Sequence, residues 1–133
     1  MSVQVVDAAA AVEMFRRTPA GREAIDLARG KTPVVPAHFD AEVFSAVGRL
    51  HRAGDLDTER VEAILSVLER SPFIRYELRP LLREAWALRH NLSLRDALYV
   101  ALARRVGGSL LTADGRLARA PGLGIDVQVV GAG

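Results

Sequence analysis

Short strand-like runs alternate along this chain with longer stretches that have helical periodicity. The first run, Val3–Val6, has the β-branched residues typical of a buried strand, and similar short runs follow at 33–36, 73–78, 109–112 and 125–130. At least one predicted helix separates each run from the next. Parallel strands need such crossovers, whereas antiparallel strands can be joined by tight turns. The pattern therefore predicts a mostly parallel sheet of about five strands.

Residues that favour caps and breaks mark the expected helix boundaries. Thr18 and Pro19 are suited to begin a helix, and Gly30 is suited to end it. The stretches 37–70 and 81–106 each hold two helices in succession, which are extra to a simple alternation of strand and helix. The fold class predicted is a three-layer α/β domain. The expected helices span 8–17, 18–29, 37–53, 57–70, 80–90, 93–106 and 115–119.

The length of 133 residues suits a single domain, expected to span 1–133, with a frayed Gly-Ala-Gly tail at 131–133. With no cysteine, disulfides and thiolate metal sites are excluded. The sequence has no run of 18 apolar residues, so no membrane span is predicted. Its N-terminus has no basic segment, so it does not resemble a secretory signal. A cytoplasmic protein is expected.

The basic residues are almost all arginine, since Lys31 is the only lysine among 18. Arginine has a planar fork of donors suited to phosphate and to stacking on bases. A GC-rich coding sequence would produce the same bias, and the net charge of +2 is modest. Composition alone therefore does not establish nucleic-acid binding.

Four acidic residues are predicted to lie at one edge of the sheet. Asp7 directly follows the first strand, and Asp114 lies two residues beyond the fourth. Glu42 is in the second turn of the helix after the second strand, and Asp96 is in the first turn of a helix leading into the fourth. Carboxyl ends of parallel strands share an edge with the amino ends of such helices, and ligands bind there.

Each acid also has a structural interpretation. Asp7 and Asp114 suit helix N-caps, and Asp96 stands three residues after Ser93, close to a capping box. Glu42 could be a solvated helix residue, and periodicity alone does not separate it from Asp40. Capping, however, does not require the four acids to converge.

Convergence of these acids has an energetic consequence. Two carboxylates about 5 Å apart repel by roughly 3 kcal/mol at an effective dielectric constant near 20. A divalent cation would relieve this repulsion, and an all-oxygen site suits Mg²⁺ or Mn²⁺. Such ions support hydrolysis of phosphate esters. The sequence therefore predicts a metal-dependent phosphodiesterase site.

The segments around these acids resemble those of the PIN-domain ribonucleases, in particular the VapC toxins of toxin–antitoxin pairs. The resemblance spans nearly the whole chain, and its second segment selects Glu42 over Asp40. Ala9 departs from the pattern, because the family commonly has Ser or Thr two residues after the first acid. The matching segments are Val5-Val6-Asp7-Ala8-Ala9-Ala10-Ala11-Val12, Pro36-Ala37-His38-Phe39-Asp40-Ala41-Glu42-Val43, Leu92-Ser93-Leu94-Arg95-Asp96-Ala97-Leu98-Tyr99-Val100-Ala101-Leu102-Ala103 and Leu110-Leu111-Thr112-Ala113-Asp114-Gly115-Arg116-Leu117.

The resemblance implies a PIN-like fold and an endoribonuclease that cleaves single-stranded or loop RNA. It implies that Thr112 orients Asp114 or a metal-bound water by hydrogen bonding. It also implies a homodimer and a VapB-type antitoxin that inserts an arginine or its tail into the acidic site. The residues expected to bind one or two Mg²⁺ or Mn²⁺ ions are Asp7, Glu42, Asp96 and Asp114.

Other residues near these acids are open to two interpretations. Arg95 and Arg116 could hold RNA phosphates, or could be surface arginines in ion pairs. His38 could touch substrate, but a capping or core histidine is favoured. Tyr99 could stack on a base, but a core tyrosine with a bonded hydroxyl is favoured.

Three other functions are compatible with a small acidic α/β domain. A phosphoacceptor receiver domain needs a lysine after a late strand, but Lys31 precedes the second strand. A non-catalytic relative that binds RNA or a partner is suggested by Ala9, although all four acids are present. A housekeeping RNA-processing nuclease would share the same chemistry. An antitoxin gene directly upstream would favour the toxin.

Overall fold

The computed structural model describes residues 2–131 and contains seven α-helices, one 3-10 turn and five strands in that part of the chain. The predicted fraying of the tail at 132–133 lies outside the described residues. The elements in chain order are β1 (Val3–Val6), α1 (Ala8–Arg16), α2 (Pro19–Ala28), β2 (Thr32–Pro36), α3 (Phe39–Arg52), α4 (Thr58–Arg70), β3 (Ile74–Tyr76), η1 (Arg79–Leu81), α5 (Leu82–Ala87), α6 (Leu94–Val106), β4 (Ser109–Thr112), α7 (Gly115–Arg119) and β5 (Val127–Val129).

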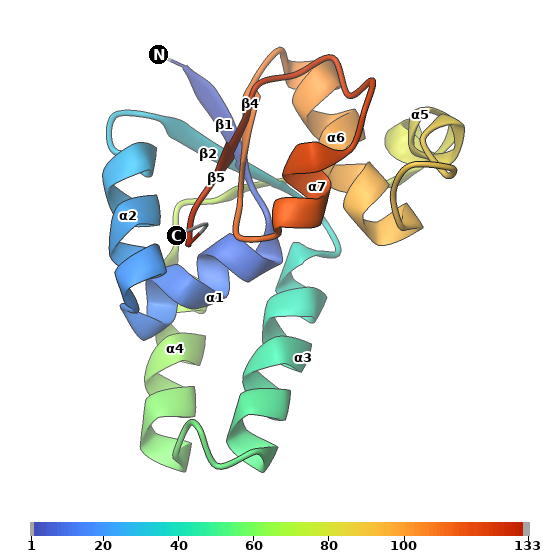
Figure 1. The fold of residues 1–133 in the computed structure, drawn as a ribbon. Coiled ribbons are helices and arrows are strands. Elements are labelled where there is room, and N and C mark those ends of the chain that lie inside the picture. Colours follow the sequence, from blue (N-terminus) through green and yellow to red (C-terminus); the bar gives the residue numbers. More distant parts are fainter. Residues whose placement is uncertain (1, 132–133) are drawn as a thin grey trace.

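The five strands form one sheet in the order β3-β2-β1-β4-β5, and every neighbouring pair is parallel. Helices α1 to α4 lie on one side of the sheet and α5 to α7 on the other (Figure 1). The two faces follow from right-handed crossovers, because the chain first moves across the sheet from β1 to β3 and then in the opposite direction from β3 to β4 and β5. The predicted three-layer α/β fold is confirmed.

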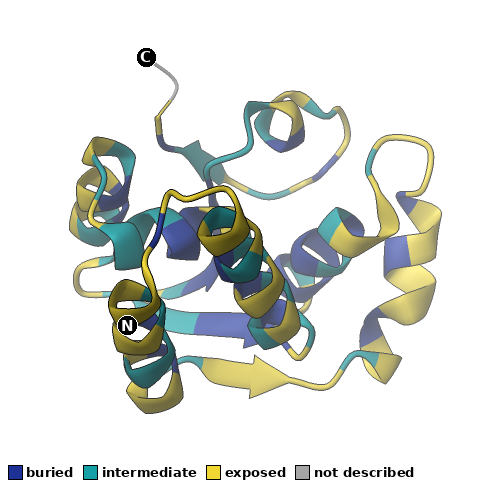
Figure 2. Ribbon diagram, turned by 90° about the horizontal axis from the view of Figure 1, so that it is seen from below, coloured by how far each residue is buried: buried dark blue, intermediate teal, exposed yellow. Residues whose placement is uncertain are grey.

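The core lies on both faces of the three central strands. Val5, Val6, Leu110 and Leu111 have no exposed surface, as expected for strands covered by helices on both sides. By contrast, β3 is exposed at every residue and forms an edge of the sheet (Figure 2). No helix in the described residues is both long and apolar enough to span a membrane.

Most predicted boundaries agree with the structure to within one or two residues, but the helix predicted at 80–90 is shorter. It begins as the 3-10 turn η1 and its α-helical part ends at Ala87. The N–H groups of Leu88, Arg89 and Asn91 then bond to carbonyls three residues earlier, which tightens the chain into turns. The strand predicted at 73–78 is also shorter.

Helices α1 and α2 pack so closely that only glycine fits between them. A Cβ atom built on Gly21 of α2 would lie 1.8 Å from the carbonyl oxygen of Glu13 in α1. Gly21 is also buried, and its N–H donates to the hydroxyl of the N-cap residue Thr18 at 3.0 Å. This contact requires a glycine where α1 and α2 pack together.

Strands β1 and β4 are neighbours whose following helices go to opposite faces of the sheet. At such a point the two chain segments diverge and leave a crevice beyond the strands' carboxyl ends. Asp7 follows β1 at this crevice, and Asp114 follows β4 after a single intervening residue. The strand order therefore places these two acids at the position where parallel α/β sheets bind ligands.

Candidate active site

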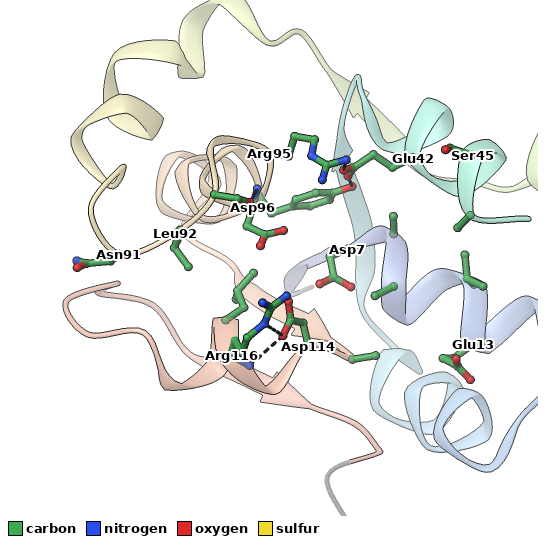
Figure 3. A pocket seen from close by; sticks show the side chains of 18 of the residues that line it. Asp7, Glu13, Glu42, Ser45, Asn91, Leu92, Arg95, Asp96, Asp114 and Arg116 are labelled. Atoms are coloured by element: carbon green, nitrogen blue, oxygen red, sulfur yellow. Dashed lines mark hydrogen bonds and ion pairs between the residues drawn. The ribbon is translucent and has the colours of Figure 1, made fainter. Parts of the chain in front are cut away.

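A cavity of about 840 Å³ opens at this crevice, and side chains from α1, α3, α6 and the start of α7 line it. In Figure 3, Asp7, Asp96 and Asp114 surround one space, and Glu42 lies beside it next to Arg95. The structure thus brings together, around one cavity, the four predicted acids Asp7, Glu42, Asp96 and Asp114. Lys31, on which the receiver-domain interpretation depends, is not among the lining residues.

Asp7 is the most buried of these acids, with only 5% of its surface exposed. It is the N-cap of α1, because its Oδ1 accepts the N–H of Ala10 at 2.8 Å. Its Oδ2 accepts a hydrogen bond from the Thr112 hydroxyl. Burial, and then the charges of Asp96 and Asp114, raise the pKa of Asp7 to about 6, although the two hydrogen bonds act in the opposite direction.

Thr112 links the two strands that carry Asp7 and Asp114. Its hydroxyl donates to Asp7, and the same oxygen accepts the N–H of Asp114 at 2.9 Å. The prediction that Thr112 positions Asp114 is consistent with this geometry. Its bond to Asp7 was not predicted, because nothing in the sequence shows that β1 and β4 are neighbours.

Asp96 and Asp114 both face the cavity, one from the first turn of α6 and the other from the start of α7 (Figure 3). Asp96 lies in the first turn of α6, where the predicted cap Ser93 accepts its N–H at 3.2 Å. Burial raises the pKa of Asp96, and the charges of Asp114 and Glu42 add to this effect. Asp114 is the N-cap of α7 and accepts the N–H of Arg116 at 2.9 Å.

The structure separates Glu42 from Asp40, as the family resemblance predicted. Asp40 forms two hydrogen bonds with the Arg75 guanidinium of β3, at 2.7 and 2.8 Å, and does not line the cavity. Glu42 does line it, and its Oε1 accepts the hydroxyl of Tyr99 at 2.7 Å. Asp40 and Glu42 are two residues apart, about half a turn of α3, so the surface ion pair and the cavity acid lie on different sides of the helix.

Two basic side chains approach Glu42 in addition to Tyr99. The Nε2 atom of His38 lies 3.4 Å from Oε1, and the Nη1 atom of Arg95 lies 3.6 Å from Oε2. His38 occupies the N-cap position of α3 but makes no capping bond through its side chain. The expected core tyrosine is confirmed, since Tyr99 is 1% exposed and its hydroxyl is bonded.

Arg95 and Arg116 are largely exposed at the rim of the cavity. Arg116 pairs with Asp114 at 3.6 Å, and the side chains of Arg95 and Arg116 are 76% and 87% exposed. Both ion pairs fit the structural interpretation, and their exposure leaves both guanidinium groups accessible to a phosphate. Their predicted contact with RNA stays a prediction.

Sequence analysis missed some of the cavity lining. Ser45 and Arg49 lie three and seven residues after Glu42 on α3, so helical spacing alone would have placed them on the same face. Asn91 follows α5 and lines the opposite end, where no sequence signal pointed to it. Ala9 lines the cavity with a methyl group, where the family commonly has a hydroxyl.

The acids fit a divalent cation by their chemistry, although they do not form a closed coordination shell. Between residues 2 and 131, no group of three or more His, Cys, Asp or Glu side chains is arranged to hold a metal ion. Within the same residues, neither Asp7 nor Asp96 has an ion pair with a basic side chain. Hydrogen bonds and the charge of Arg95 offset only part of the repulsion and burial, because the pKa values of both acids remain raised. Oxygen donors of this kind suit Mg²⁺ or Mn²⁺.

The raised pKa of Asp7 predicts how the stability of the metal-free protein depends on pH. Between the ordinary pKa of 3.8 and about 6, folded Asp7 retains a proton that the unfolded chain releases. Protonation of Asp7 therefore stabilises the fold fully below pH 3.8, and this stabilisation is lost as the pH rises through 6. The loss in the free energy of unfolding is on the order of 3 kcal/mol. We expect the free energy of unfolding of Asp7→Asn minus that of the wild type to increase by this amount from pH 4 to 7.

Urea denaturation in EDTA across this pH range measures that difference directly. Subtracting the free energies of unfolding of the two proteins cancels the effects of the other titrating groups, apart from those coupled to Asp7. A difference that stays constant with pH would show that folding does not raise the pKa of Asp7.

The family model and the similar known proteins all point to the same protein family. A model of the PIN domain matches residues 5–123. The chain is 49% identical over 117 residues to Ribonuclease VapC3 of Mycobacterium tuberculosis, covering 87% of this chain and 85% of that relative. It is 39% identical over 127 residues to Ribonuclease VapC12 of the same organism, covering 95% and 98%.

Solved structures support the fold. The chain is similar to a toxin–antitoxin complex from Klebsiella pneumoniae, with a TM-score of 0.68, 16% identity and coverage of 95% of this chain and 96% of that chain. It is also similar to VapC20 of Mycobacterium tuberculosis, described as a toxin that cleaves the sarcin–ricin loop. That match has a TM-score of 0.63, 19% identity and coverage of 86% and 92%.

Proposed function

This chain belongs to the PIN-domain family and, within it, to the VapC-type ribonucleases. From this premise we propose that it is an endoribonuclease that depends on a divalent cation and acts as the toxin of a toxin–antitoxin pair. The observation that carries the proposal is the set of four acids around one cavity. Its substrate would be single-stranded or loop RNA, cleaved to leave 5′-phosphate and 3′-hydroxyl ends.

The proposed cation would be Mg²⁺ or Mn²⁺, held by Asp7, Glu42, Asp96 and Asp114. When bound, such an ion lowers the pKa of water and stabilises negative charge on a phosphodiester. Asp7 supports this role because its carboxylate is buried among like charges and each of its oxygens accepts only one hydrogen bond. A carboxylate oxygen can accept more than one interaction, so both remain able to bind a cation.

The chain's own residues would orient the RNA. Arg95 and Arg116 would contact phosphates on either side of the scissile bond, since both line the cavity and are exposed. Thr112 would hold Asp7 and Asp114 in a fixed relative position through its two hydrogen bonds. Preorganised acids of this kind need no rearrangement when charge develops.

RNA cleavage with and without the cation tests the proposal. We expect cleavage in 5 mM Mg²⁺ or Mn²⁺ and none in EDTA, with mapped ends carrying the 5′-phosphate. The same cations should raise the melting temperature by about 5 °C, because they bind only the folded site.

The control is Asp96→Asn, which should lose most of the cation-dependent shift while its melting temperature in EDTA does not fall. Binding of RNA without cleavage in either cation would contradict the nuclease and favour a non-catalytic relative. Cleavage that persists in EDTA would contradict the metal-dependent mechanism.

The family also leads us to propose a VapB-type antitoxin and a homodimer. Large apolar side chains remain exposed on α5 and at the start of α6, as expected of a surface that a protein partner covers. Trp86 is 56% exposed, Leu82 52% and Leu94 50%. An antitoxin arginine entering the acidic cavity would relieve the same repulsion as a cation does. A cytoplasmic location stays a prediction from the sequence.

A further inference from the structure

A buried hydrogen bond joins helix α6 to the acid on helix α3. The hydroxyl of Tyr99 donates to Oε1 of Glu42 at 2.7 Å, across 57 residues of sequence. We propose that Tyr99 is a positioning residue that fixes the Glu42 carboxylate for cation binding, an inference that rests on the proposed function. It concerns the arrangement of the site and assigns Tyr99 no contact with substrate.

The hydroxyl of Tyr99 is suited to act as a permanent donor. The residue is 1% exposed, and it is packed among core side chains that fix its ring. A phenol keeps its proton at neutral pH, because its ordinary pKa is about 10. Glu42 therefore always has a donor in the same place.

His38 restrains the same carboxylate oxygen and packs against Tyr99. The two ring centroids are 4.9 Å apart, and Nε2 of His38 lies 3.4 Å from Oε1 of Glu42. The same nitrogen is 3.2 Å from the carbonyl oxygen of Arg95, so it faces two acceptors and is assigned the ring hydrogen. The other nitrogen, Nδ1, is buried without a hydrogen-bond partner.

These contacts leave the two oxygens of Glu42 in different situations. Oε1 lies against the Tyr99 hydroxyl and the His38 ring, which are buried or nearly so. Among residues 2–131, Oε2 has an ion pair only with the exposed Arg95 guanidinium, at 3.6 Å. An ion pair with an exposed arginine contributes little free energy, so a cation can displace the arginine easily. Oε2 is therefore the oxygen available to a cation, and Oε1 is its anchor.

The anchor also relates Glu42 to a second acid. Asp96 and Tyr99 are three residues apart on α6, so they lie on the same side of that helix. The bond from Tyr99 thus ties the position of Glu42 on α3 to that of Asp96. A free glutamate has three side-chain torsions, and without the anchor the distance between these two carboxylates would vary.

Tyr99→Phe tests the inference, because it removes only the hydroxyl and keeps the ring packed. We expect the Mn²⁺ affinity, measured by isothermal titration calorimetry, to fall about 10-fold, as for other residues that orient metal ligands. The fold, judged by circular dichroism, should be retained. Tyr76→Phe is the matched control, since Tyr76 is the only other tyrosine, lies on β3 and does not line the cavity. Its Mn²⁺ affinity should be unchanged.

A double-mutant cycle with Glu42→Gln separates positioning from a general structural effect. If Tyr99 acts through Glu42, adding Tyr99→Phe to Glu42→Gln should cause no further loss of Mn²⁺ affinity. Equal losses in both backgrounds would overturn the inference, and so would unchanged or tighter Mn²⁺ binding by Tyr99→Phe. If the wild type itself binds no Mn²⁺, the proposed function fails instead.

Discussion

Replacement of Asp7 by asparagine is expected to lower RNA cleavage by at least about 1000-fold while the protein stays folded. Asparagine keeps an oxygen that can accept the N–H of Ala10, so the cap of α1 is preserved. It removes a buried negative charge that interacts with the charges of Asp96 and Asp114. Loss of about 4 kcal/mol of charge stabilisation in the transition state corresponds to a factor of this size.

Cleavage of a labelled RNA under single-turnover conditions measures the effect, and growth inhibition on induced expression gives a second readout. Asp40→Asn is the matched control, because Asp40 pairs with Arg75 outside the cavity. That variant should retain cleavage within a few-fold. Undiminished cleavage by Asp7→Asn would contradict the proposed mechanism, even if variants of the other acids lost activity.

Replacement of Gly21 by alanine is expected to destabilise the fold by about 3 kcal/mol or more. The added Cβ would meet the backbone oxygen of Glu13 at 1.8 Å and its carbonyl carbon at 2.3 Å. Backbone cannot move aside as a flexible side chain does, so α1 and α2 must separate. Because whole domains are stable by only about 5–15 kcal/mol, this loss is a large fraction of the total.

Gly48→Ala is the control for this substitution, since Gly48 lies inside α3 and an added Cβ would meet only the Arg52 side chain at 3.5 Å. It should stabilise the protein by about 0.5–1 kcal/mol, because alanine favours the helix more than glycine does. Urea denaturation compares both variants with the wild type. A loss below 1 kcal/mol in Gly21→Ala would mean that α1 and α2 are not in close contact in solution.

The parallel sheet was predictable because its signals are local. β-branched runs, the Thr18 cap with Pro19, and glycines after helices mark the elements within a few residues of each boundary. The extent of the helix after β3 was not predictable. Its helical residues continue past Ala87 in the sequence, but the chain turns there through hydrogen bonds of the 3-10 type.

The site was predictable as a set of acids at one edge, but its internal contacts were not. The choice between Asp40 and Glu42 came from family resemblance, and the reason for it is the arginine at position 75, far away in sequence. The bonds from Thr112 to Asp7 and from Tyr99 to Glu42 join residues 105 and 57 positions apart. Such pairs depend on strand order and helix packing, which one sequence does not specify.

The burial of Asp7 has a consequence for how this protein loses activity by mutation. In the metal-free protein at neutral pH the buried carboxylate opposes folding, so a substitution that removes its charge is expected to yield a molecule that is folded but inert. Cells selected to survive expression of the toxin would then accumulate intact, long-lived copies rather than degraded ones. These copies would keep the surface offered to the antitoxin and would compete for it with active toxin.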